Sequence, residues 1–85
     1  MPGGESKGID ITEKYYVTIR NVRITGFDYG IFAAPSPSAW SQAFGNSLYS
    51  NNITGNTYDG IFFYALDSSI YGNSITSNGR DGIHV

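Results

Sequence analysis

The sequence has no cysteine and only one histidine, His84, in its 85 residues. The absence of thiols excludes a disulfide framework and a thiolate metal site, and a single imidazole excludes a metal centre of clustered histidines within the chain. Charged residues make up 14% of the chain and the formal net charge is −2, so no basic patch favours a nucleic-acid partner. Composition therefore indicates one small domain, or part of one.

Long apolar stretches are missing as well. No run reaches membrane-spanning length, and residues 1–7 lack the apolar core of a signal peptide, so we expect neither a membrane anchor nor a signal peptide in this chain. Gly, Asn, Ser, Thr and Tyr are abundant while charges are few. That balance is typical of solenoids outside the cell, so we expect an extracellular or cell-envelope location.

Residues 46–85 contain the same motif twice, with a constant spacing between equivalent positions. The pairs that share this spacing are Asn51 and Asn73, Ile53 and Ile75, Asn56 and Asn78, Asp59 and Asp81, and Gly60 and Gly82. A fixed period of about 22 residues indicates a stacked repeat, or solenoid. Gly8-Ile9 also stands one such period before Gly30-Ile31, so the repeat extends into the first half.

These columns predict about three coils, followed by the start of another at residues 83–85. The expected coils are residues 9–30, 31–60 and 61–82, and residues 1–8 are expected to form a tail or a partial cap. The step from Ile31 to Leu48 is nearly twice as long as the equivalent step from Ile61 to Ile70. Since extra residues leave a solenoid as a loop on one face, we predict an inserted loop at residues 33–45.

Short alternating apolar runs such as Val17 and Ile19 predict strands, because a helix would need an apolar stripe over about ten or more residues. A coil of this length with short strands and no helix predicts an all-β, parallel β-helix, in which each strand pairs with its equivalent one coil later. The expected inward files are Ile9, Ile31, Ile61 and Ile83; Ile11, Ala33, Phe63 and Val85; Ile19, Leu48 and Ile70; and Ile24, Ile53 and Ile75.

Glycine and asparagine occupy the predicted corners. Glycine precedes the inward isoleucine in successive coils, at Gly30, Gly60 and Gly82. We expect these positions either to require a positive φ or to lack room for a Cβ. Asn51 and Asn73 predict a ladder in which each side-chain amide bonds the next coil from a left-handed or bridge-region corner.

Two stretches carry a resemblance to a known superfamily. The sequences Asn51-Asn-Ile-Thr-Gly-Asn-Thr-Tyr-Asp-Gly-Ile and Asn73-Ser-Ile-Thr-Ser-Asn-Gly-Arg-Asp-Gly-Ile resemble repeats of the right-handed, pectin-lyase-like parallel β-helices. The resemblance covers residues 9–85 and implies a right-handed, single-stranded solenoid. The superfamily includes polysaccharide lyases and hydrolases, mannuronan C5-epimerases, phage tailspikes and NosD-like envelope proteins, so it does not imply one activity.

Residues 17–30 are similar to the region that precedes the catalytic Asp-Pro-His of the epimerases. At that point this sequence reads Ile31-Phe-Ala-Ala-Pro35, with neither Asp nor His. The resemblance therefore does not carry the epimerase activity to this chain.

Asp59 and Asp81 are candidates for chemistry, since they share a column with Tyr29 and lie beside Arg80. Two carboxylates one coil apart must be well solvated, share a proton or hold a cation. Calcium-dependent lyases of the superfamily use acidic pairs with an arginine base. The resemblance thus implies Asp59, Arg80 and Asp81 as catalytic candidates, with Asp59 and Asp81 as Ca²⁺ ligands. The alternative is that both aspartates close turns by bonding local backbone amides.

Outward aromatic columns are a second candidate site. One file places Tyr49 and Tyr71 above Arg20, and another places Phe32 and Phe62 below His84. Aromatic faces beside polar groups suit sugar rings, and the inserted loop carries the only tryptophan. The candidate carbohydrate-binding residues are therefore Trp40, Tyr49, Phe62 and Tyr71. The alternative is aromatic pairing that only stabilises the sheet.

The sequence thus predicts a non-catalytic β-helix module of a carbohydrate-associated or cell-surface protein, with Ca²⁺ as the one cofactor left open. One alternative is a fragment of a polysaccharide lyase or C5-epimerase whose catalytic residues are mostly absent. Another is a structural block that stacks on copies of itself, because an uncovered terminal coil exposes strand edges. We accordingly expect a glycan as partner, or self-association or chain continuation through the open ends.

Overall fold

The computed structural model describes residues 6–35 and 42–85, and within these ranges every regular element is a β-strand. The strands are β1 (Lys7–Asp10), β2 (Thr18–Arg20), β3 (Arg23–Ile24), β4 (Tyr29–Ala33), β5 (Ala43–Phe44), β6 (Ser47–Tyr49), β7 (Asn52–Thr54), β8 (Asp59–Phe63), β9 (Ala65–Leu66), β10 (Ser69–Tyr71), β11 (Ser74–Thr76) and β12 (Ile83–His84). Their shortness follows from the polar and glycine residues that interrupt each apolar run.

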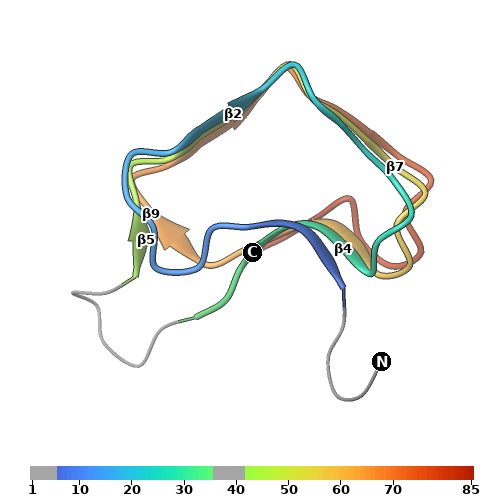
Figure 1. Cartoon of the computed structure of the whole chain (residues 1–85), viewed down its shortest axis with the longest axis horizontal. Helices are drawn as coiled ribbons and strands as arrows, with labels where there is room; N and C mark the ends of the chain where they lie inside the picture. The colour runs from blue at the N-terminus through green and yellow to red at the C-terminus, as the bar shows by residue number, and fades with distance from the viewer. Residues whose placement is uncertain (1–5, 36–41) are drawn as a thin grey trace.

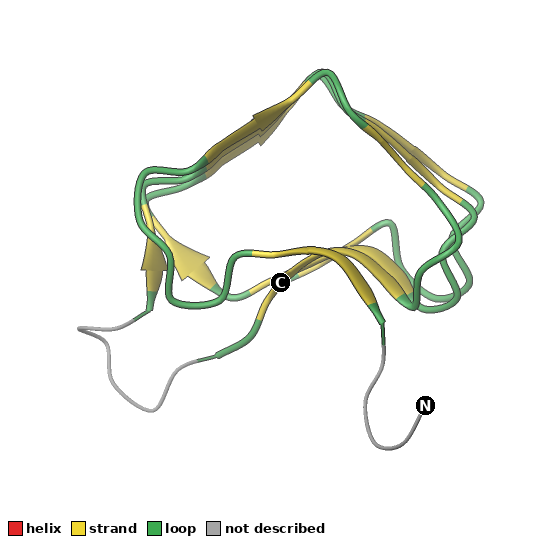
Figure 2. Cartoon of the chain, in the orientation of Figure 1, coloured by secondary structure: helices red, strands yellow, loops and turns green. Residues whose placement is uncertain are grey.

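Each strand pairs in parallel with its equivalent in the next coil. The three main sheets have the orders β1-β4-β8-β12, β2-β6-β10 and β3-β7-β11. Viewed down the shortest axis, the coils superimpose and enclose one outline, with strands on the sides and loops at the corners (Figures 1 and 2). The molecule measures 33 × 33 × 17 Å, and the short dimension agrees with four strands at a spacing of about 4.8 Å. The predicted parallel β-helix is confirmed.

The register also follows the predicted columns. Ile31 pairs with Ile61, and Ile53 pairs with Ile75. The middle of the stack is the best buried, since Ile31, Leu48 and Ile53 of the second coil and Ile61 at the start of the third are all inaccessible to solvent. At the end of the described stack, two residues of the predicted inward files are exposed: Ile83 at 42% and Val85 at 83%.

The predicted loop at 33–45 is too long at both ends. Ala33 belongs to β4 and pairs with Phe63, while Ala43 begins β5 and pairs with Ala65 of β9. The short β5-β9 sheet is a fourth stack that the sequence pattern did not predict. Trp40 lies outside the described residues. The predicted tail is also too long, because β1 begins at Lys7.

Crowding, rather than a positive φ, requires glycine at Gly30 and Gly60, whereas a Cβ on Gly82 would meet only Cγ2 of Ile75, at 3.4 Å. A Cβ on Gly30 would overlap the carbonyl oxygen of Gly60 and lie 2.8 Å from Cγ2 of Ile53. The left-handed corner lies one residue before the asparagine column, in a file composed of Asn21, Ser50 and Gly72 with φ values of 57°, 56° and 63°. Asn51 and Asn73 are therefore not left-handed themselves, and the bridge-region alternative for them stays a prediction.

The asparagine ladder is confirmed, and it is one of several. The Oδ1 atom of Asn73 accepts the backbone N–H of Asn51 at 3.0 Å, and Oδ1 of Asn51 accepts that of Val22 at 3.2 Å. Parallel ladders pass through the buried Asn46 and Asn56. Because these amides bond the neighbouring coils, no buried side-chain polar atom among the described residues lacks a partner.

Candidate functional site

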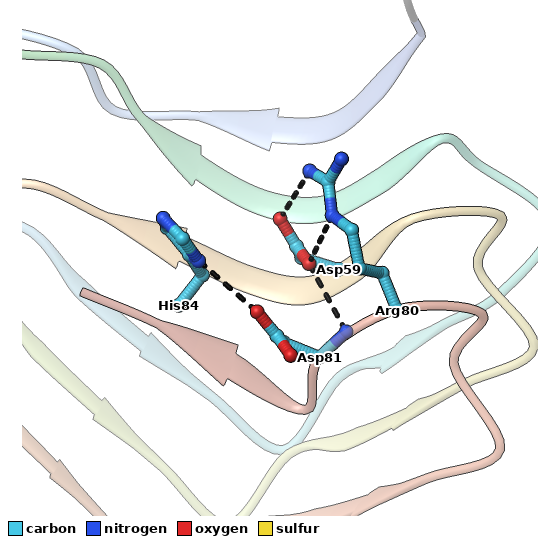
Figure 3. A network of polar contacts seen from close by, with 4 residues as sticks. All are labelled: Asp59, Arg80, Asp81 and His84. Carbon is cyan, nitrogen blue, oxygen red and sulfur yellow. Dashed lines mark hydrogen bonds and ion pairs between the residues drawn. The ribbon is translucent and has the colours of Figure 1, made fainter.

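In the predicted acidic pair of Asp59 and Asp81, the carboxylate of Asp59 is bound by Arg80 (Figure 3). Asp59 begins β8 and its side chain is 0% exposed. Arg80, in the loop before β12, donates from Nη2 to Oδ2 of Asp59 at 3.0 Å and from Nε to Oδ1 at 3.3 Å. The backbone N–H of Asp81 also donates to Oδ1 of Asp59, at 3.1 Å. Asp59 therefore bonds groups of the next coil, and the predicted alternative of bonds to local backbone amides is wrong for it.

Arg80 remains a cation in this arrangement. The pKa of its guanidinium is raised above the ordinary arginine value, first by the hydrogen bond to Asp59 and then by one to Tyr29. A raised pKa works against a general-base role, because a base must be deprotonated near the working pH. The guanidinium also lies over the ring of Tyr58, 5.2 Å from its centre. The geometry therefore fits a tie between two coils better than a proton acceptor.

The carboxylate of Asp81 contacts His84 (Figure 3). Its Oδ2 atom lies 3.0 Å from Nδ1 of His84, and its side chain is about half exposed. The two carboxylates therefore have different partners, Arg80 for Asp59 and His84 for Asp81. Among the described residues no group of three or more His, Cys, Asp or Glu side chains could hold a metal ion. Calcium binding by Asp59 and Asp81 stays a prediction.

The predicted aromatic files exist, but their rings cover one another. Phe62 stacks on Phe32 at 5.0 Å and 14°, and on His84 at 5.0 Å and 5°. Tyr49 and Tyr71 stack at 5.1 Å and 6°. A sugar ring packs on an aromatic face, and Phe62 has a neighbour on each face. Phe62 is therefore unsuited to sugar stacking, whereas Tyr71 is 57% exposed.

An open groove of about 550 Å³ lies at the corner between the β2-β6-β10 and β3-β7-β11 sheets. It is lined by Asn21, Val22, Arg23, Ser50, Asn51, Asn52, Gly72 and Ser74. We call it the corner groove. Its outward row is one column of successive strands, in which Arg23 pairs with Asn52 and Asn52 pairs with Ser74. All three of these residues are exposed.

The sequence analysis did not identify the corner groove. Arg20 and Arg23 stand on either side of the first corner, at outward positions of β2 and β3. Neither arginine forms an ion pair with another residue in the described part of the chain. Arg20 is in register with Tyr49, which is in register with Tyr71, so the Tyr49–Tyr71 stack continues the column of Arg20. The sequence signal that could have indicated the corner groove is the presence of two outward arginines on either side of one corner.

The same fold is found by comparison with known families. A model described as a right-handed β-helix region matches residues 7–85. The chain belongs to the right-handed β-helix family. The match begins at the first residue of β1 and covers all four sheets of this right-handed β-helix. No curated protein and no solved structure matches the chain.

In the described ranges of the β-helix, no helix is long and apolar enough to cross a membrane. The two candidate sites lie on different sides of the solenoid. The groove follows the corner between β2 and β7, and the Asp59–Arg80 pair lies by the sheet that contains β4 (Figure 1). Each site can therefore be altered without changing the other.

Proposed function

We propose that this β-helix is a non-catalytic module that binds carbohydrate in the corner groove, with acidic sugars as the preferred class. The observation that carries the proposal is the polar lining of the groove, which includes Arg23. Arg23 and the nearby Arg20 have no acidic partner in the described chain. The module would act outside the cell or in its envelope, where polysaccharides are exposed.

The chemistry of the lining suits a hydroxylated ligand. Asn52 and Ser74 can each donate and accept hydrogen bonds, and the Arg23 guanidinium can bind a carboxylate with two parallel bonds. The groove volume of about 550 Å³ lies within the range of roughly 300–1,000 Å³ seen for ligand sites. Its open form, which follows the stacked strands, suits an extended chain of sugars.

The non-catalytic part of the proposal is supported by the Asp59–Arg80 pair. Asp59 is buried and bonded to Arg80 through both oxygens. Using either group in a reaction would break this pair and leave a buried charge uncompensated, which is strongly destabilising. The arrangement therefore favours a structural role over acid–base chemistry at this position.

The test is a glycan array with and without Ca²⁺, followed by calorimetry with an acidic and a neutral oligosaccharide. Arg23→Ala should weaken binding of the acidic glycan by about tenfold or more, since it removes charge-assisted hydrogen bonds of about 1.5–3 kcal/mol. Lys14→Ala removes the same charge from an exposed position near β5, away from the groove, and should leave affinity unchanged.

Equal losses in the two variants, or no glycan bound by the wild type, would refute the proposal. Turnover of a bound glycan would favour the lyase alternative instead. Binding that requires Ca²⁺ and is lost in Asp81→Asn would establish the calcium site. Sedimentation velocity on the same sample tests the self-stacking alternative.

A further inference from the structure

Asn78 and Gly79 lie in the loop between β11 and β12, and both are fixed by the coil beneath them. The side chain of Asn78 takes part in four hydrogen bonds. Its Oδ1 accepts from the backbone N and from Nδ2 of Asn56, at 3.0 and 2.9 Å, and its Nδ2 donates to the carbonyls of Ile53 and Thr76, at 3.3 and 3.1 Å. Only a side-chain amide combines two accepted and two donated bonds in this geometry.

Gly79 has an equally specific reason to be glycine. A Cβ at this position would overlap the carbonyl oxygen of Thr57 in the preceding coil. A carbonyl of a stacked coil cannot move aside as a flexible side chain can. The ladder therefore requires asparagine at 78, and the coil spacing requires glycine at 79.

The pair Asn-Gly is chemically labile, because glycine has no side chain to shield its backbone nitrogen. The Gly79 nitrogen can attack Cγ of Asn78, which forms an N–Cγ bond and breaks the Cγ–Nδ2 bond. Nδ2 leaves as ammonia, with the proton that was on the Gly79 amide. Water then opens the resulting five-membered imide at either carbonyl, which gives aspartate or isoaspartate.

The native coil prevents this attack. The Gly79 N–H donates to the carbonyl oxygen of Asn56 at 2.9 Å, so the nitrogen faces the neighbouring coil. The Asn78 amide is held in its four bonds and cannot rotate toward that nitrogen. Reaction therefore requires the coil to open, which local unfolding allows at lower free energy than global unfolding.

We propose that Asn78 is a deamidation site. The reaction is prevented in the native stack and becomes possible when the last described coil unwinds. Once formed, the carboxylate can still accept from Asn56, but it has no N–H for the carbonyls of Ile53 and Thr76. Two acceptors then face a negative charge in a half-buried position, which disfavours closure of the coil. Each opening therefore carries a risk of an irreversible change. This inference is independent of glycan binding.

The test follows the conversion of Asn78 by peptide mapping and mass spectrometry, in mildly alkaline buffer, with and without enough urea to unfold the chain. Asn73-Ser74, which has the equivalent ladder position in the preceding corner, is an internal comparator. In urea, Asn78 should convert faster than Asn73. In buffer, conversion of Asn78 should be slower by at least about tenfold, a ratio that needs only about 1.4 kcal/mol of local stability. Equal rates in buffer and in urea would overturn the proposal.

The consequence for folding is tested separately with Asn78→Asp. This variant should have a lower melting temperature than Asn52→Asp, which adds the same charge at an exposed position of β7. Failure of Asn78→Asp to fold would agree with the proposal, and the comparison of rates in the wild type decides it independently. Equal melting temperatures for the two variants would overturn the claim that the product blocks closure.

Discussion

One inward file offers two isoleucines, in successive coils, that can be replaced one at a time. Comparing the two replacements measures how much the stability contributed by a buried side chain depends on having a coil on both sides of it. Ile53 and Ile75 are the same residue type, in register on β7 and β11. Ile53 is fully buried in the middle coil, whereas Ile75 is only partly buried in the last described coil. Alanine at each position removes the same atoms from different surroundings.

Ile53→Ala should destabilise the fold by about 2–5 kcal/mol, through lost apolar burial and the cavity left behind. Ile75→Ala should destabilise it by at most about half as much, because part of its side chain already contacts water. Against a net stability of roughly 5 kcal/mol for a small domain, the first loss is severe. A loss of about 3 kcal/mol lowers the melting temperature by roughly 12–24 °C in a domain of this size.

Urea and thermal unfolding followed by far-ultraviolet circular dichroism give both free energies. Ile53→Asp is the extreme member of the series and should abolish folding, since an unpaired carboxylate would be buried. Equal effects of the two alanine variants would refute the argument that coverage by a following coil decides the energy. A cooperative melt of Ile53→Asp close to that of the wild type would refute the inward position of Ile53.

Two further changes test the polar interior. Asn51→Ala should lower the free energy of unfolding by about 2–4 kcal/mol, because the Val22 N–H and the Ile19 carbonyl lose their partner. Asn52→Ala, at the exposed neighbouring position, should change it by no more than about 0.5 kcal/mol. Similar unfolding curves for the two variants would contradict the ladder. Arg80→Met should lower the melting temperature by leaving the Asp59 carboxylate buried without a counter-charge, and Asp59→Asn should partly restore it. Because the pKa of Arg80 is raised in the folded state, the stability that the ion pair contributes is fully present below the unfolded-state pKa and is lost only as the pH rises through the folded-state pKa. The difference in melting temperature between wild type and Arg80→Met should therefore persist in mildly alkaline solution, and its disappearance there would contradict this.

The columns of the stack could be predicted from sequence because each coil repeats the same residue types at one spacing. The aromatic files could be predicted for the same reason. The covering of each ring face by the next ring could have been predicted too, since a coil spacing of about 4.8 Å is close to the separation of stacked rings. By contrast, Asn21, Ser50 and Gly72 share a left-handed corner but no residue type, so no column marked it.

The sequence grouped Asp59, Arg80 and Asp81 but did not predict the direct bond between Asp59 and Arg80, because columns compare only equivalent positions. The column sets Asp59 against Asp81 and predicts repulsion. The side chain of Arg80, one residue earlier, reaches across to the lower coil and binds Asp59. Contacts between unlike positions depend on side-chain length and direction, which a repeat alignment does not contain.

The asparagine ladders give the solenoid a direction. In each ladder the backbone N–H belongs to the earlier coil and the accepting side chain to the later one, as for Val17 and Asn46, or Phe27 and Asn56. During synthesis from the N-terminus, a newly emerged coil therefore has corner amides whose partners have not yet been made. The corner amides of each coil are therefore satisfied only when the side chains of the following coil are in place.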